Sequence, residues 1–276
     1  MIRSLQRRRF AIGAAGLGLA AAVPAWLATA QAQTVDEIKK KGELTVGLLV
    51  DFPPYGTVNS ANEPDGYDAD VARLLAKDWG VKLKLVPVTG PNRIPFLLTN
   101  KADVVISSLT ITPERQKVVD FTIPYAAIQS VIAAPASADI KSISDLAGKT
   151  VVTARGTTND MNVTKLAPAG TDIVRFENDA TAMTAVTSGR ADIYSGAPAI
   201  IASLNKELKK NGKPPLVTKV VMATSMLGLG VAKNNPALLD KLNEMIRKDL
   251  KNGELNTIYK KYHGADLPQD VLKEGK

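Results

Sequence analysis

The chain has no cysteine and a single histidine among its 276 residues. Without cysteine it forms neither disulfides nor thiolate metal sites, and it cannot carry a lipid anchor on a cysteine. The one histidine, His263, lies in the C-terminal tail, so no histidine base is at hand for a serine nucleophile. No His/Asp/Glu cluster has metal-ligand spacing, and no serine stands in a Gly-x-Ser-x-Gly elbow. We therefore expect no metal, no cofactor and no catalytic residue.

Long apolar runs are also absent, apart from a short one at the N-terminus. Arg3, Arg7, Arg8 and Arg9 precede Phe10 and an Ala/Gly/Leu/Val run over 11–23, and small residues follow at Ala28, Ala30 and Ala32. This pattern predicts a cleaved export signal over residues 1–32, and hence a periplasmic protein. The pair Arg7-Arg8 resembles a twin-arginine signal, while an ordinary Sec signal is the alternative.

The formal net charge of +8 overstates the basicity of the mature protein. Four arginines and no acids lie in the export signal, which leaves about +4 for the rest of the chain. The lysine runs at 39–41 and 209–210 are typical of solvated helix ends. We therefore expect no nucleic-acid partner.

From Leu44 onward the apolar pattern alternates between strand and helix. Strands are predicted over 44–49, 81–86 and 103–107, with helices over 68–80, capped by Asp68, and 93–100. A second series has strands over 130–134, 150–153, 173–176 and 191–194, with helices over 159–166, 179–188 and 197–210. A strand over 227–231 and two C-terminal helices, the first from Pro236, follow. This order predicts an α/β protein with mostly parallel sheets flanked by helices.

The segment from Asp103 to Tyr125 carries the strongest functional signal. Its apolar strand ends in hydroxyls at Ser107, Ser108 and Thr110. A helix then starts, with Thr112 as N-cap and Arg115 on its first turn. Ligands bind at the carboxyl ends of strands in such sheets, and a guanidinium matches the two oxygens of a carboxylate. The segment therefore predicts a receptor for a small carboxylate, with an ordinary strand-to-helix connection as the alternative.

The motifs of this segment resemble those of the family 3 extracellular solute-binding proteins, the polar amino-acid receptors of ABC importers. The resemblance rests on Ser-Ser-Leu-Thr, Thr-Pro-Glu-Arg, Val-Asp-Phe-Thr and Pro-Tyr within 107–125. It extends to Gly-Tyr-Asp-Ala-Asp at 66–70, Ser-Asp-Leu-Ala-Gly-Lys at 144–149, Gly-Thr-Thr at 156–158, Ser-Gly-Arg-Ala-Asp at 188–192 and Ile-Tyr-Lys-Lys-Tyr at 258–262. It covers nearly the whole mature chain.

The resemblance implies a two-lobed periplasmic binding protein fold of type II. Lobe 1 would comprise 33–126 and 228–276, lobe 2 would comprise 130–223, and two hinge strands would lie near 126–129 and 224–227. It further implies a monomer that closes on a small ligand and then docks on an inner-membrane ABC permease.

The resemblance also assigns the binding residues. Phe52 would cover the aliphatic part of the ligand, because the two prolines that follow it hold its loop extended. Tyr55 is the second choice for this role, with core packing as the alternative. Ser107, Ser108, Thr110 and Arg115 match the carboxylate-binding set of the family. Ser108 and Thr110 would give backbone N–H and hydroxyl contacts and Arg115 the bidentate ion pair, with capping of the strand as the alternative for Ser107. From the facing lobe, Thr157 and Thr158 would close on the carboxylate at a helix N-terminus.

One position departs from the family pattern. Members usually place an acid, the partner of the ligand's α-ammonium group, where this chain has Ala197. We expect either that Asp160 takes this role or that the ligand has no amine. Arg93 and Arg155 could add positive charge near the cleft, although a solvated helix start is favoured for Arg93.

The sequence thus predicts the binding protein of an ABC importer, most simply for an amino acid. A receptor for a non-amino organic acid is one alternative. The other is a dehydratase-like enzyme of the same fold acting on a cyclic carboxylate, which the alanine at position 197 disfavours because it removes the obvious general acid.

Overall fold

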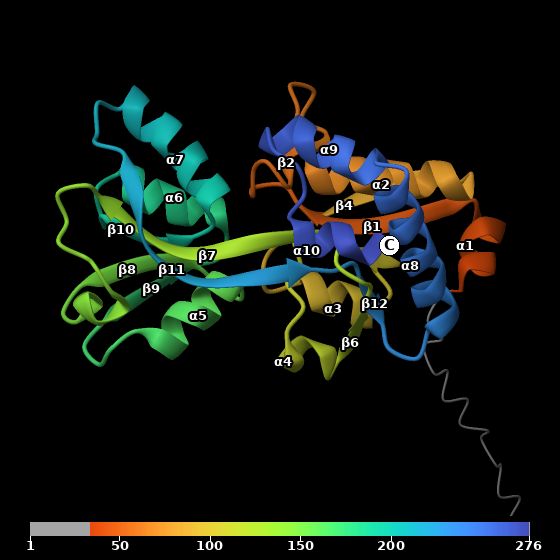
Figure 1. Cartoon of the computed structure of the whole chain (residues 1–276), viewed down its shortest axis with the longest axis horizontal. Coiled ribbons are helices and arrows are strands. Elements are labelled where there is room, and N and C mark those ends of the chain that lie inside the picture. Colours follow the sequence, from red (N-terminus) through yellow and green to blue (C-terminus); the bar gives the residue numbers. More distant parts are fainter. Residues whose placement is uncertain (1–33, 276) are drawn as a thin grey trace, which may run out of the picture. The chain divides into compact units, whose positions relative to one another are not determined.

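The computed structural model describes residues 34–275, and the predicted export signal lies outside them. Two five-stranded sheets, each flanked by helices, form the α/β architecture that the sequence predicted (Figure 1). The first sheet has the order β4-β1-β5-β12-β6. Its strands are β1 (Glu43–Leu49), β4 (Lys82–Val88), β5 (Val104–Val105), β6 (Val119–Phe121) and β12 (Gly230–Ala232).

The second sheet has the order β11-β7-β10-β8-β9. Its strands are β7 (Ala126–Pro135), β8 (Thr150–Ala154), β9 (Asp172–Phe176), β10 (Ile193–Gly196) and β11 (Leu216–Leu227). In each sheet one strand, β12 or β7, runs against the other four. A small third sheet pairs β2 (Thr57–Val58) with β3 (Pro64–Asp65).

The burial of the strands follows their position in the sheet. In central β1, six consecutive residues from Leu44 to Leu49 are buried, as a strand covered by helices on both faces requires. At the sheet edge β4 leaves Lys82 and Lys84 exposed, because alternate side chains of an edge strand face solvent. The strand predicted over 227–231 is in fact two: Leu227 ends β11, and β12 starts at Gly230.

The helices fall into two groups along the chain. Those before, between or after strands of the first sheet are α1 (Val35–Lys41), α2 (Tyr67–Trp79), α3 (Arg93–Leu98), α4 (Pro113–Gln116), α8 (Pro236–Lys251), α9 (Glu254–His263) and α10 (Gln269–Leu272), with the 3₁₀ turn η2 (Lys273–Gly275). Those of the second sheet are α5 (Thr158–Leu166), α6 (Asp179–Thr187) and α7 (Pro198–Lys210), with η1 (Ile143–Leu146).

Two of the predicted helix signals can be checked against cap geometry. Thr112 caps α4 as predicted, its hydroxyl accepting from the Arg115 N–H at 3.2 Å. The predicted cap of α2 by Asp68 is wrong, because the N-cap is Gly66 and Asp68 lies inside the first turn. The buried carboxylate of Asp68 instead accepts hydrogen bonds from Ser108 Oγ at 2.9 Å and from Tyr125 Oη at 2.6 Å.

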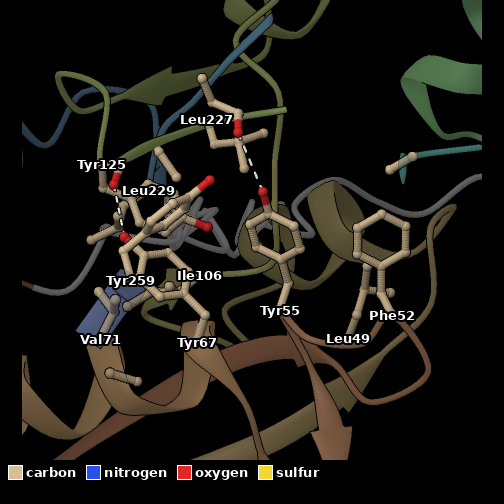
Figure 2. Packing of buried hydrophobic residues seen from close by; sticks show 14 of the residues in the cluster. Leu49, Phe52, Tyr55, Tyr67, Val71, Ile106, Tyr125, Leu227, Leu229 and Tyr259 are labelled. Carbon is tan, nitrogen blue, oxygen red and sulfur yellow. Dashed lines mark hydrogen bonds between the residues drawn. The ribbon is translucent and has the colours of Figure 1, made fainter. Parts of the chain in front are cut away.

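Four tyrosines pack together where α2, α9 and the start of β7 meet (Figure 2). The ring of Tyr67 stacks on Tyr125 and meets Tyr259 edge-on, and its hydroxyl donates to the Tyr125 carbonyl at 2.8 Å. The Tyr55 hydroxyl donates to the carbonyl of Ala127 at 3.2 Å. Tyr55 therefore has the packing role that the sequence left open for it, and it fixes the start of β7.

The buried carboxyl group of Asp249 should make the stability of the protein depend on pH. Asp249 of α8 is fully buried, and within 34–275 neither of its carboxylate oxygens has a hydrogen-bond partner, although Lys248 Nζ lies 3.4 Å away. Burial raises the pKa of Asp249 to about 6. Because the pKa is higher in the folded than in the unfolded chain, the carboxyl costs stability as the pH rises through about 6.

We therefore expect Asp249→Asn to raise the melting temperature at pH 8 and to change it much less at pH 4. Thermal unfolding at both pH values measures this. Asp240→Asn, at an exposed site on the same helix, is the control and should change neither melting temperature. A melting temperature lowered by Asp249→Asn at pH 8 would contradict the prediction.

Candidate functional site

A small cavity is lined by strand ends, loops and helix starts of both sheets and by residues of the strands β7 and β11. Its volume is about 20 Å³, which holds little more than a water molecule. The residues around it include five of those predicted to bind the ligand, together with the acid Asp179. The full lining is Leu49, Phe52, Arg93, Ser108, Thr110, Ile128, Gln129, Ser130, Thr157, Thr158, Asn159, Asp179 and Ser225. A ligand larger than water therefore needs the walls to separate.

Two arginines converge at one backbone carbonyl beside this cavity. Arg115 donates from its two terminal nitrogens to the carbonyls of Thr110 at 2.9 Å and Gly156 at 3.1 Å. Arg93 donates to the same Gly156 oxygen at 3.4 Å and to the Ser107 carbonyl at 3.0 Å. The hydroxyls of Thr110 and Thr158 lie 2.9 Å apart. The strand end after β5 and the loop before α5 thus meet at this point.

Neither arginine has an acidic partner within 4.0 Å in the described part of the chain. Burial, and then the positive charge of Arg93, lower the pKa of Arg115 to about 9. Burial also lowers the pKa of Arg93. Arg93 is only 3% exposed and lines the cavity, so the solvated helix start favoured from sequence is wrong. The site therefore holds positive charge that an anion can neutralise.

Asp179, which the sequence analysis treated only as a helix start, supplies a carboxylate to the same cavity. It is the first residue of α6 and is 3% exposed, and its Oδ1 accepts from the Tyr194 hydroxyl at 2.9 Å. Burial, and then the charge of Asp51, raise its pKa to about 7. Asp51 follows β1, and its Oδ2 accepts from the Ala180 N–H at 3.3 Å. Only the fold brings these two acids together, since 128 positions separate them in the chain.

The predicted acid Asp160 is engaged away from the cavity. Its Oδ1 lies 2.7 Å from Nε of Arg175 in an ion pair, and its Oδ2 accepts from the Gly156 N–H at 3.1 Å. It is not among the residues that line the cavity. The structure therefore gives Asp160 the role of holding the loop before α5, and the acid that faces the cavity is Asp179.

The two predicted serines are also bonded within the protein. Ser107 is fully buried, its hydroxyl accepting from the Leu49 N–H at 3.0 Å, and it does not line the cavity. Ser108 does line the cavity, but its hydroxyl donates to Asp68 and its N–H donates to the Tyr125 hydroxyl at 3.2 Å. Ser107 and Ser108 therefore fix the end of β5 rather than present free hydroxyls.

The remaining predicted residues meet at the cavity. Phe52 supplies an apolar wall, Thr110 faces Thr158, and Thr157 caps α5 by accepting from the Asp160 N–H at 3.1 Å. Arg115 does not itself line the cavity, but its guanidinium reaches the Gly156 carbonyl directly before the two threonines. Arg155, the other arginine considered, is exposed.

Residues 34–275 contain neither a metal-binding cluster nor a membrane-spanning helix. No group of three or more His, Asp or Glu side chains there could hold a metal ion. No helix in that part of the chain is long and apolar enough to cross a membrane.

Comparison with known proteins gives a consistent family assignment. Residues 44–265 match the model of the bacterial extracellular solute-binding proteins, family 3. The glutamine-binding protein GlnH of an ABC transporter from Bacillus subtilis (strain 168) is 32% identical over 241 residues, which are 84% of this chain and 85% of GlnH. The L-cystine-binding protein TcyJ of Escherichia coli (strain K12) is 30% identical over 84% of this chain and 87% of its own.

A solved structure agrees with these sequence relatives. The crystal structure of a mutant of ArgBP from T. maritima superposes with a TM-score of 0.76 at 36% identity, and the match covers 84% of this chain and 100% of that one.

Proposed function

Since the chain belongs to the bacterial extracellular solute-binding proteins of family 3, we propose that it is the binding protein of an ABC importer and captures a free amino acid in the cavity between Phe52, Thr110, Thr158 and Asp179. The observation that carries the proposal is the charge pattern. Two buried arginines, neither of which forms an ion pair within residues 34–275, meet at one side of the cavity, and the buried carboxyl group of Asp179 lies in its wall. An α-amino acid carries the two complementary charges on neighbouring atoms.

The carboxylate of the ligand would bind at the junction of Arg115 and Arg93. Both guanidinium groups now donate to the Gly156 carbonyl, which is a neutral acceptor. A carboxylate offers stronger, charge-assisted hydrogen bonds to the same donors and restores electroneutrality. Thr110 and Thr158 add hydroxyl donors from either side. Phe52 would cover the aliphatic part of the ligand.

The ammonium group of the ligand would bind Asp179. Burial, and then the charge of Asp51, raise the pKa of this carboxyl to about 7, and Arg93 and the Tyr194 hydroxyl offset the rise only in part. An ammonium group would favour the ionised carboxylate and also offset the repulsion from Asp51. Asp179 would thereby replace the acid that the family resemblance leads one to expect at the position of Ala197.

Entry of the ligand would require the two lobes to separate. We assign 33–126 and 228–276 to lobe 1 and 130–223 to lobe 2, with hinges near 126–129 and 224–227. In support, β7 and β11 pair there in antiparallel register from Ala126 opposite Leu227 to Gln129 opposite Thr224. Bending these strands would open the cavity. The closed monomer, exported to the periplasm through its N-terminal signal, would then dock on an inner-membrane permease.

The alternatives are less well supported. A ligand without an amine would add no positive charge to that of Arg93 near the buried carboxyl of Asp179. A dehydratase of the same fold is not favoured, because the relatives described above are binding proteins of transporters.

A calorimetric screen of natural amino acids, cystine and glutamine included, tests the proposal. The decisive comparison is between the amino acid that binds best and its α-hydroxy analogue, which keeps the carboxylate but lacks the ammonium. We expect the analogue to bind at least about tenfold more weakly. Tighter binding of the analogue, or no amino acid that binds, would reject the proposal.

Tyr194 should tune the pH range over which the protein binds. Its hydroxyl donates to Asp179 and lowers the pKa of that carboxyl. Tyr194→Phe removes this bond, so the pKa of Asp179 should rise further and the loss of affinity at acid pH should begin at a higher pH. Dissociation constants measured from pH 5 to pH 9 for both proteins would show the shift, and superimposable profiles would contradict it.

A further inference from the structure

A second cavity also borders the strands β7 and β11 where they pass between the two assigned lobes. Its volume is about 390 Å³, against about 20 Å³ for the cavity beside Phe52 and Asp179. We call the second one the rear cavity and the smaller one the front cavity. Residues 128 and 129 of β7 border both, so the two cavities lie against the same short ribbon.

The pairing of the two strands places the cavities on opposite faces of this ribbon. Ile128 pairs with Ser225 and Gln129 pairs with Thr224, in unbroken antiparallel register. Paired residues share a face of the ribbon, and successive residues along a strand alternate between its faces. Ser225 lines the front cavity but not the rear one, and Thr224 lines the rear cavity but not the front one.

The next residue on either side in β7 follows the same alternation. Ser130, in phase with Ile128, lines the front cavity, and Ala127, in phase with Gln129, lines the rear one. The ribbon of β7 and β11 therefore separates the two cavities.

The rear cavity has walls from both lobes, as the front cavity does. Lobe 1 contributes Tyr55, Tyr259 and His263, and lobe 2 contributes Pro198 and Ala199 at the start of α7. Under the lobe assignment above, the chain crosses between the lobes along β7 and β11. When such a ribbon bends to part the walls on one face, it brings the walls on the other face together.

The lobe 1 wall of the rear cavity is firmly packed. His263 stacks on Tyr259 with ring centroids 4.1 Å apart and meets Tyr55 edge-on at 4.7 Å. The Tyr55 hydroxyl also donates to the carbonyl of Ala127 at the ribbon. Because close-packed rings yield little, the approach of α7 would have to take up the free volume.

We propose, on the basis of the lobes and the binding function proposed above, that opening of the front cavity uses up the space of the rear cavity. The side chains around the rear cavity would then set the affinity for the ligand without touching it. A small front cavity combined with a large rear one is the arrangement that the closed form of such a pivot requires. A bulkier residue in place of Thr224 or Ala199 would oppose opening and favour the closed form.

Thr224→Trp and Ala199→Trp test this from two sides of the rear cavity. Thr224 is exposed and Ala199 is half-buried, and a cavity of about 390 Å³ can hold the larger side chain while the lobes are closed. Each variant should bind the amino acid found in the screen at least about threefold more tightly and release it more slowly, because the open form is destabilised and the closed, ligand-bound form is not.

Val221→Trp is the matched control. Val221 lies on the same strand as Thr224, is 52% exposed and borders neither cavity. Its substitution should leave the affinity and the rate of release as in the wild type.

Opening can also be measured without a ligand. Because the chain has no cysteine, Lys117→Cys and Lys165→Cys can carry a pair of spin labels at exposed positions, one directly after α4 in lobe 1 and one on α5 in lobe 2. In the ligand-free protein the fraction of short distances between the labels should be larger in both rear-cavity variants than in the wild type and in Val221→Trp.

Two outcomes overturn the proposal. One is that both rear-cavity variants keep the wild-type affinity and distances, and the other is that they bind more weakly and show longer distances. Thermal unfolding shows whether each variant is folded, and Ala199→Trp decides if Thr224→Trp does not fold. If no amino acid binds the wild type, the proposed function fails, and the distances in the ligand-free protein decide on the pivot separately.

Discussion

Arg115→Ala should remove measurable amino-acid binding while the protein remains folded. The guanidinium is buried, and its hydrogen bonds within the protein go to the neutral carbonyls of Thr110 and Gly156. A ligand carboxylate would be its one strong partner, and loss of one member of a sequestered charge pair costs about 2–5 kcal/mol. Calorimetry with the amino acid found in the screen should therefore show at least a 30-fold loss, since about 1.4 kcal/mol is tenfold.

The controls for this prediction separate geometry from charge. Arg115→Lys keeps the charge but loses the paired donors, so it should also bind poorly. Arg155→Ala removes an exposed arginine from the neighbouring loop and should bind like the wild type. Thermal unfolding confirms that each variant is folded. Wild-type affinity in Arg115→Ala would refute the assignment of the carboxylate site.

Asp179→Asn should weaken amino-acid binding and at the same time stabilise the free protein. The substitution removes the charge that would pair with the ammonium, so we expect a loss of affinity of at least about tenfold at pH 8. In the free protein the pKa of Asp179 is raised to about 7, mainly by burial. Its ionisation therefore costs stability as the pH rises through that value, and Asn removes this cost at pH 8.

The pH dependence of binding gives an independent readout of the same residue. Below about pH 7 Asp179 becomes protonated, and the wild-type affinity should then fall by up to about tenfold per pH unit. In Asp179→Asn this dependence should disappear. If the wild-type affinity is constant from pH 5 to pH 8, Asp179 is not the ammonium partner.

Asp160→Asn is the matched control for Asp179→Asn. Asp160 is paired with Arg175 and lies outside the cavity lining, so its substitution should lower the melting temperature but leave the affinity within about threefold. A large loss of affinity in Asp160→Asn, with none in Asp179→Asn, would reverse the assignment and restore the one expected from the sequence.

The alternation of strand and helix, the cap at Thr112 and the helix end at Gly80 could all be predicted from the sequence. These features depend on local propensities and periodicity, which neighbouring residues determine. Phe52, Thr110, Thr157 and Thr158, which the family motifs singled out, line one cavity, and Arg115 lies beside it. Each motif contains a strand end or a helix start, so local sequence could bring these residues to one edge of the sheets; that they bind the ligand stays a prediction.

The tertiary structure decided which polar groups are free to act. Asp68 and Ser108 look like a helix cap and a ligand donor in sequence, but folding pairs them with each other. Asp160 forms an ion pair with Arg175, 15 positions away. Arg93, which the sequence placed at a solvated helix start, lines the cavity. Asp179 meets Asp51 only because residues far apart in the chain converge there. Burial and pairing depend on such long-range contacts. The sequence therefore determined the family and the strand ends and helix starts around the site, while the tertiary structure determined which charged side chains face the cavity.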